Sequence, residues 1–228
     1  MCYDEKTSWL TLGIGSIVNI GVLLYLGIEH RNSQNKDLIY PVVVLLFYHF
    51  CLFIQIPEGM AWGQIRRNQK IEKGTDWAVS ILLVMQPVIL GLLVYGACVY
   101  TGRPIPIRFW VTVLIILLTM CCWSLQGRNT NLTNLTGPTP QCNHLQYQWA
   151  KSSSKLLPYF VTMLLFFSVL PPTWWVTSTV ICIGSYVWAY LMYPCATASL
   201  WCWSIALSGL VVLLVDTFQR KVFKPQMR

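Results

Sequence analysis

Two polar side chains with the capacity for chemistry stand inside an apolar stretch near residue 55. Gln55 and Glu58 follow a run of mostly apolar residues. At 3.6 residues per turn they fall on one helical face together with three other residues. The members of this face are Tyr48, Cys51, Gln55, Glu58 and Trp62. A carboxylate in hydrocarbon costs a few kcal/mol. We therefore expect Glu58 to face protein or water, where it would hold an ion, a proton or a polar ligand.

A blander reading of Glu58 stays open. Pro57 and Gly59 flank it and are typical of a helix end. In that case Glu58 lies at the membrane surface close to Arg66 and Arg67.

Two further polar sites lie inside apolar segments. His49 is about 13 Å from Glu58 along a helix axis and either forms a helix–helix hydrogen bond or relays protons, of which we expect the first. Pro87 follows Gln86 in mid-helix and frees a backbone carbonyl. We expect Gln86 to bond to that carbonyl or across to the second helix. Gln55 and Glu58 would then face Gln86, with water in the space that a kink at Pro87 opens.

Catalytic and metal-binding patterns are missing from the sequence. His30, His49 and His144 have neither H-x-x-x-H nor H-E-x-x-H spacing. The sequence also has no G-x-S-x-G motif, and the last apolar segment, 200–218, has no lysine that could carry retinal. We therefore expect no catalytic residues, no metal and no cofactor.

The composition points to lipid as the solvent. Of the 228 residues, 55% are hydrophobic and 11% are charged, whereas soluble domains carry roughly 25% charged residues. The net charge of +8 comes from bases scattered through polar loops. This pattern favours anionic lipid headgroups over nucleic acid as the partner of the basic residues.

The apolar segments predict an all-α fold, a single domain of seven transmembrane helices, because about 20 mostly apolar residues cross a bilayer. The expected spans are 9–28, 38–61, 76–100, 107–125, 155–170, 174–193 and 200–218. The fifth is short for a crossing. One long polar loop, 126–154, separates the fourth span from the fifth. Asp216 and Arg220 have the i, i+4 spacing of an ion pair.

The long loop predicts an orientation. It contains two glycosylation sequons, at Asn131 and Asn134. If either is used, the loop and the N-terminus lie outside and the basic C-terminal tail lies in the cytoplasm, as the positive-inside rule favours. The number of basic residues does not decide the orientation, because this topology places eight Lys and Arg on each side of the membrane. Cys142 and Cys195 would then share the oxidising side, where a disulfide between them is feasible.

Three short motifs carry a resemblance to a known family. They are the second-span end with Gln55, Glu58 and Trp62, the pair Gln86-Pro87, and the triplet Trp201-Cys202-Trp203. Together they resemble uncharacterised seven-span membrane proteins encoded by large DNA viruses of algae and protists. The resemblance implies seven helices and a polar contact between the second and third, and it implies no known activity.

The function expected from these features is a non-enzymatic conduit or transporter for a small solute or ion. His49, Gln55, Glu58 and Gln86 would line its polar cavity. Two other classes stay open, namely a non-catalytic receptor, sensor or partner-binding protein, and a lipid-modifying intramembrane enzyme. Acid-sensitive flux, a tight protein partner and turnover of lipid would distinguish the three.

Overall fold

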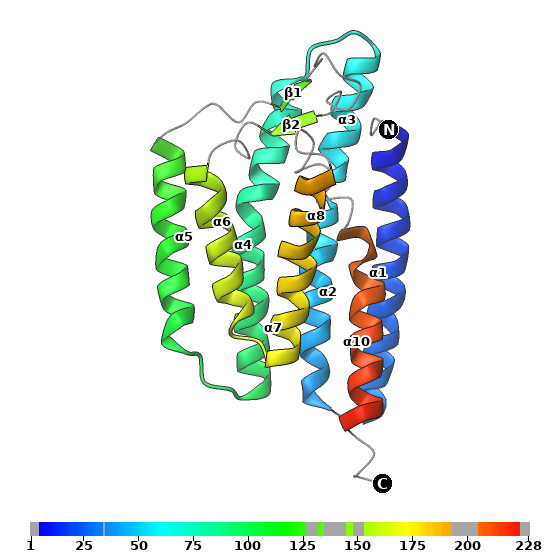
Figure 1. The fold of residues 1–228 in the computed structure, drawn as a ribbon, viewed down its shortest axis with the longest axis vertical. Helices are drawn as coiled ribbons and strands as arrows, with labels where there is room; N and C mark the ends of the chain where they lie inside the picture. Colours follow the sequence, from blue (N-terminus) through cyan, green and yellow to red (C-terminus); the bar gives the residue numbers. More distant parts are fainter. Residues whose placement is uncertain are drawn as a thin grey trace.

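The protein is a bundle of helices that run along one long axis (Figure 1). The computed structural model describes residues 5–33, 35–125, 132–134, 145–147, 153–192 and 205–223. Four helical stretches within them are long and apolar enough to cross a membrane, namely Glu5–Ser33, Lys36–Arg66, Lys73–Thr101 and Pro172–Met192. The α1 end of the chain and the α10 end lie at opposite ends of the bundle (Figure 1).

The elements follow one another up and down this axis, and a helix overlaps each segment for which the sequence predicts one. In order they are α1 (Glu5–Ser33), η1 (Lys36–Leu38), α2 (Ile39–Leu52), α3 (Gln55–Arg66), α4 (Lys73–Thr101), α5 (Ile107–Leu125), β1 (Leu132–Asn134), β2 (Leu145–Tyr147), α6 (Ser153–Phe167), α7 (Pro172–Thr179), the π-helical η4 (Val180–Gly184), α8 (Ser185–Met192), η5 (Ile205–Leu207) and α10 (Ser208–Phe223). The described apolar parts of α5 and α6 are shorter than 18 residues, so length and hydropathy alone do not make them spans.

The expected second span, 38–61, is two helices and not one. Proline has no N–H to bond to the carbonyl four residues earlier, and its ring clashes with that carbonyl. For Pro57 this is the carbonyl of Phe53, where the chain turns between α2 and α3. The Phe53 carbonyl instead accepts from the N–H of Ile56 at 3.1 Å. Helix α3 begins at Gln55 and continues to Arg66, so Pro57 lies in the first turn of a helix and Gly59 does not end one.

Helix α2 is the centre of the bundle. It packs against α1, α4, α7 and α10, and it has buried residues on all sides, as expected of a helix that is apolar all round. The Phe47 ring lies 5.8 Å from that of Phe167 in α6. Beside it, Phe166 of α6 packs against Phe109 of α5 at 5.3 Å. The aromatic core therefore joins α2, α5 and α6.

The ends of the helices are tied by polar contacts. Helix α4 ends at Thr101, one residue beyond the expected span 76–100, because Gly102 adopts φ = 70°, a conformation that glycine tolerates. Next to it, Tyr40 donates to Thr101 Oγ1 at 3.1 Å. At the other end Arg66 pairs with Glu5 at 3.1 Å and holds α3 against α1.

The long polar loop contains a short strand pairing that the all-α prediction did not include. β1 and β2 are antiparallel, with Thr133 opposite Gln146. Asn134 is the last residue of β1. Asn131, Cys142 and Cys195 lie outside the described residues, so their glycan and disulfide stay predictions.

Candidate functional site

The carboxylate of Glu58 lies inside the bundle. Only 1% of Glu58 and 2% of Gln55 is exposed. Both sit on α3, which packs closely on α1, because a Cβ at Gly59 would lie 2.8 Å from the ring of Trp9. The burial of Glu58 supports the interior reading over the surface one. Gln55 also carries an Nε2 without a hydrogen-bond partner in the described part of the chain.

A hydrogen-bonded contact fixes α3 against α4. Gln64 donates from Nε2 to Thr75 Oγ1 at 3.3 Å, and its Oε1 accepts from the backbone N–H of Glu72 at 3.0 Å. Both Gln64 and Thr75 are buried. The contact sets the relative heights of residues on the two antiparallel helices, because each residue advances the axis by about 1.5 Å.

Gln86 lies lower in the bundle than Glu58. From the level of the Gln64–Thr75 contact it is about 16 Å down α4, whereas Gln55 is about 13 Å and Glu58 about 9 Å down α3. Gln55 and Gln86 are thus nearly level, and Glu58 is about one and a half turns above. The direct facing of Gln55 and Glu58 toward Gln86 stays a prediction.

Gln86 has a partner on a helix that the sequence did not suggest. It is buried in α4, and its Oε1 accepts a hydrogen bond from the hydroxyl of Tyr159 in α6. The expected partners were the carbonyl freed by Pro87 and the second helix. Tyr159 reaches Gln86 because α6 packs against α4.

A buried asparagine adds to the set and was missed from the sequence. Asn19 of α1 is 0% exposed, and a Cβ at Gly209 of α10 would overlap its Oδ1. Neither Oδ1 nor Nδ2 of Asn19 has a hydrogen-bond partner among the described residues, and the same holds for the buried Oγ of Ser208. The available signal was an amide in the middle of the first apolar segment.

A second polar contact joins α2 to α7 in mid-bundle. Tyr48 donates to the backbone carbonyl of Ser178 at 2.7 Å. Both helices run in the same direction, so one turn further the buried thiols of Cys51 and Cys182 lie close enough to interact electrostatically. Cys182 lies within the π-helical turn η4, a local irregularity frequent at functional sites.

His49 lies apart from these contacts. Its ring packs edge-on against Phe53 at 5.4 Å. It is half-buried, and its Nδ1 has no hydrogen-bond partner in the described segments. The helix–helix hydrogen bond expected of His49 is therefore not seen at Nδ1.

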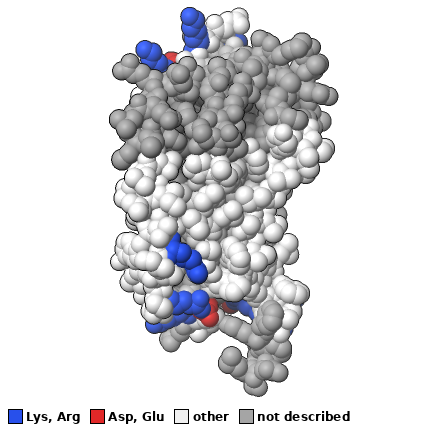
Figure 2. Space-filling view, turned by 60° about the vertical axis from the view of Figure 1, so that its left-hand side comes forward, with Lys and Arg blue, Asp and Glu red and all other residues white. Residues whose placement is uncertain are grey.

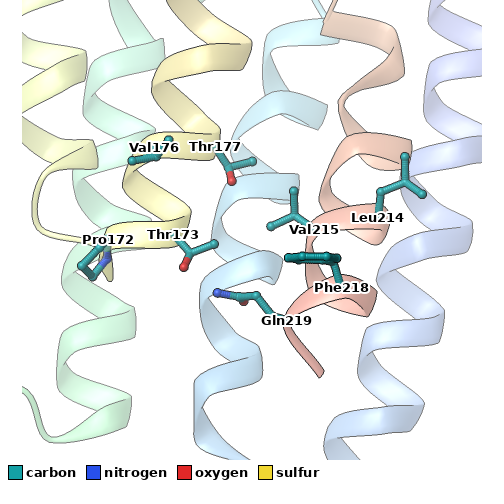
Figure 3. A pocket seen from close by; sticks show the side chains of 8 residues that line it. All are labelled: Pro172, Thr173, Val176, Thr177, Leu214, Val215, Phe218 and Gln219. Carbon is teal, nitrogen blue, oxygen red and sulfur yellow. The ribbon is translucent and has the colours of Figure 1, made fainter. Parts of the chain in front are cut away.

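An open groove of about 660 Å³ lies between α7 and α10 (Figure 3). Helix α7 packs on α2 and α6, and α10 packs on α1 and α2, so the two helices stand apart over α2. The residues lining the groove are Pro172, Thr173, Val176, Thr177, Leu214, Val215, Phe218 and Gln219. It is mostly apolar and open to the side of the bundle.

On the face that Figure 2 shows, the described Lys, Arg, Asp and Glu side chains lie toward the two ends of the molecule, and the described residues in its middle are uncharged. At the α10 end, Arg220 pairs with Asp216 at 2.6 Å, which confirms the predicted i, i+4 pair. Arg220 also binds Glu29 of α1 at 2.5 Å. The sequence did not predict Glu29 as a second partner of Arg220, because Glu29 lies on the first helix of the chain.

Comparison with protein-family models, with curated proteins and with solved structures finds no match. The family resemblance inferred from the sequence stays a prediction, and Trp201 and Trp203 lie outside the described residues. Within the described segments, no group of three or more His, Cys, Asp or Glu side chains is placed to hold a metal ion.

Proposed function

We propose that the protein is a multi-pass membrane conduit or transporter for a small solute or ion. The observation that carries the proposal is the buried carboxylate of Glu58, which sits on a short helix behind a break in a membrane-length helical stretch. Broken helices and buried ionisable groups are the usual parts of transport sites in membrane bundles.

The transport path would follow the buried polar groups from one end of the bundle toward its middle. Glu58 comes first, Gln55 and Gln86 lie at nearly the same depth below it, and Asn19 of α1 is buried further along the bundle. Gln55 Nε2 and the amide of Asn19, which have no hydrogen-bond partner among the described residues, offer hydrogen bonds to a passing solute or to water. Glu58 supplies the charge that selects a cation or a proton.

The proposed topology has seven spans with the N-terminus outside. The helical passes alternate in direction, and the α1 end of the chain lies opposite the α10 end (Figure 1). In this topology the long loop is outside and Asn131 or Asn134 carries glycan. The test is expression in a eukaryotic host, where glycosidase treatment should shift the gel mobility of the protein and the shift should be lost when both asparagines are changed to Gln. A protease-protection experiment that places the loop on the cytoplasmic side of the membrane would overturn the topology.

Flux through the purified protein in liposomes tests the transport function. A pH step is imposed across liposomes that contain a pH-sensitive dye, and the rate of the dye signal reports proton movement. Repeating the step with K⁺ or with Na⁺ outside shows whether either cation changes that rate. We expect Glu58→Gln to keep the fold and to lower flux at least tenfold, because the amide keeps the shape and loses the charge. Glu72→Gln, an exposed carboxylate change at the start of α4, is the matched control.

Two outcomes would contradict the proposal. Flux that is unchanged in Glu58→Gln would remove the carboxylate from the path. Absence of any flux, together with stable capture of one partner, would favour the receptor or sensor class.

A further inference from the structure

The groove between α7 and α10 is amphipathic along its length. Val176, Leu214 and Phe218 form its apolar walls. Thr173 and Gln219 lie toward the end where α7 begins and α10 finishes (Figure 3). A volume of about 660 Å³ falls within the range of ligand sites, about 300–1,000 Å³. An occupant that matches this lining has an apolar chain and a polar head.

The polar end of the groove carries an available cation. Lys221 shares a helical face with Leu214 and Phe218, at spacings of seven and three residues. Its side chain is exposed and has no ion pair among the described residues. Its neighbour Arg220, in contrast, is held by Asp216 and Glu29. Lys221 does not line the groove itself, but it follows two residues after Gln219, the last lining residue of α10, and is free to bind an anion at this end.

The start of α7 adds a second positive element at the same end. Pro171 precedes the helix and Pro172 opens it. Pro172 has no N–H and the N–H of Trp175 donates to the Pro171 carbonyl, so the first-turn N–H groups left to favour an anion are those of Thr173 and Trp174. Thr173, which lines the groove, lies in this first turn. A headgroup phosphate at this end would meet both Lys221 and the α7 N-terminus.

We propose that the groove is a binding site for one anionic phospholipid. An acyl chain lies along Val176, Leu214 and Phe218, and the phosphate sits at Lys221 and the start of α7. The inference rests on the proposed membrane topology, in which this end faces the cytoplasmic leaflet with its anionic lipids. It does not require the protein to move a solute.

Native mass spectrometry of the detergent-purified protein tests the headgroup. The probes are phosphatidylglycerol and phosphatidylcholine with identical acyl chains. We expect one retained lipid and a preference of about fivefold for phosphatidylglycerol, the size expected from one lysine near an anionic headgroup. Lys221→Gln should bring the ratio close to one, whereas Lys36→Gln, an exposed lysine of η1 at the same end, should leave it unchanged.

Filling the groove tests the location of the acyl chain. Val176→Trp should abolish the retained lipid, whereas Val187→Trp, on α8 above the groove, should not. The two valines have similar exposure, 55% and 46%. Leu214→Trp repeats the test from the α10 wall if Val176→Trp does not fold. Equal retention of the two lipids by the unaltered protein, or a retained lipid in both groove variants, would overturn the proposal.

The lipid site and the transport function fail separately. Loss of flux in Glu58→Gln with lipid retained leaves the groove assignment intact. Lipid binding abolished by Val176→Trp with flux unchanged leaves the conduit intact.

Discussion

Of the described glycines that contact an aromatic ring, Gly91 of α4 lies closest to one. Its replacement by alanine therefore measures how rigid the packing of the core is. A Cβ at Gly91 would lie 2.7, 3.1 and 3.3 Å from Cζ, Cε2 and Cε1 of Phe166. The ring cannot swing away, because Phe166 is buried and packs against Phe109. Forcing an extra methyl group into a filled core costs about 1–3 kcal/mol.

Gly96→Ala is the matched control. Gly96 lies on the same helix, and a Cβ there meets nothing within 4 Å. Both substitutions gain about 1 kcal/mol in helix propensity, and this gain cancels when the two variants are compared. The remaining difference is the overpacking at Phe166. We therefore expect Gly91→Ala to be about 2 kcal/mol less stable than Gly96→Ala, or about 4–8 °C lower in melting temperature for a chain of this size.

Thermal unfolding in detergent, followed by tryptophan fluorescence, provides the measurement. In a Gly91→Ala background, Phe166→Leu should cost less than it does alone, because the smaller side chain relieves the overlap. Equal melting temperatures for Gly91→Ala and Gly96→Ala would show that α6 moves away from the added methyl group without loss of stability. The packing of Phe166 against α4 would then be wrong as described.

Three further outcomes follow from buried contacts. Asn19→Leu should raise the free energy of unfolding by about 1–2 kcal/mol, because it removes a buried amide that has no partner in the described part of the chain, and should lower flux; destabilisation in the same thermal assay would contradict it. Glu29→Gln should lower stability by about 1 kcal/mol, since it removes one of two carboxylates on the α10 guanidinium, whereas Asp37→Asn, in an exposed pair at 3.7 Å, should have little effect. Cys51 and Cys182 should bind one Hg²⁺ between them, so changing either one to Ser should abolish this site. If each single variant loses only half of the mercury bound by the pair, the two thiols bind separately and do not share an ion.

Local rules predicted the parts of this protein that depend on neighbours in sequence. The helical segments follow from runs of apolar residues, and the Asp216–Arg220 pair follows from i, i+4 spacing. The burial of Glu58 follows from the cost of exposing a carboxylate to hydrocarbon. Pro57 carried the signal for the break between α2 and α3, but a proline starts one helix and ends another at the same place.

Partners distant in sequence could not be predicted in this way. Gln86 is bonded to Tyr159, and Arg220 to Glu29, and nothing in the local sequence of either donor or acceptor specifies which helix lies opposite. Asn19 is a similar case, because its environment is set by the close approach of Gly209 on the last helix. Helix order around α2 decides these contacts, and it depends on the packing of the whole chain.

Three of the unpartnered polar groups lie next to irregular parts of the backbone. Gln55 follows the break after α2, Ser178 precedes the π turn η4, and Ser208 follows the 3₁₀ turn η5. Each has a buried side-chain atom without a hydrogen-bond partner in the described segments. Such a group costs about 1–3 kcal/mol, so a bundle built for packing alone would gain by having regular helices and apolar side chains at these places. Water or a solute that hydrogen-bonds to these groups offsets the cost, and this gives the proposed path its physical basis independently of Glu58.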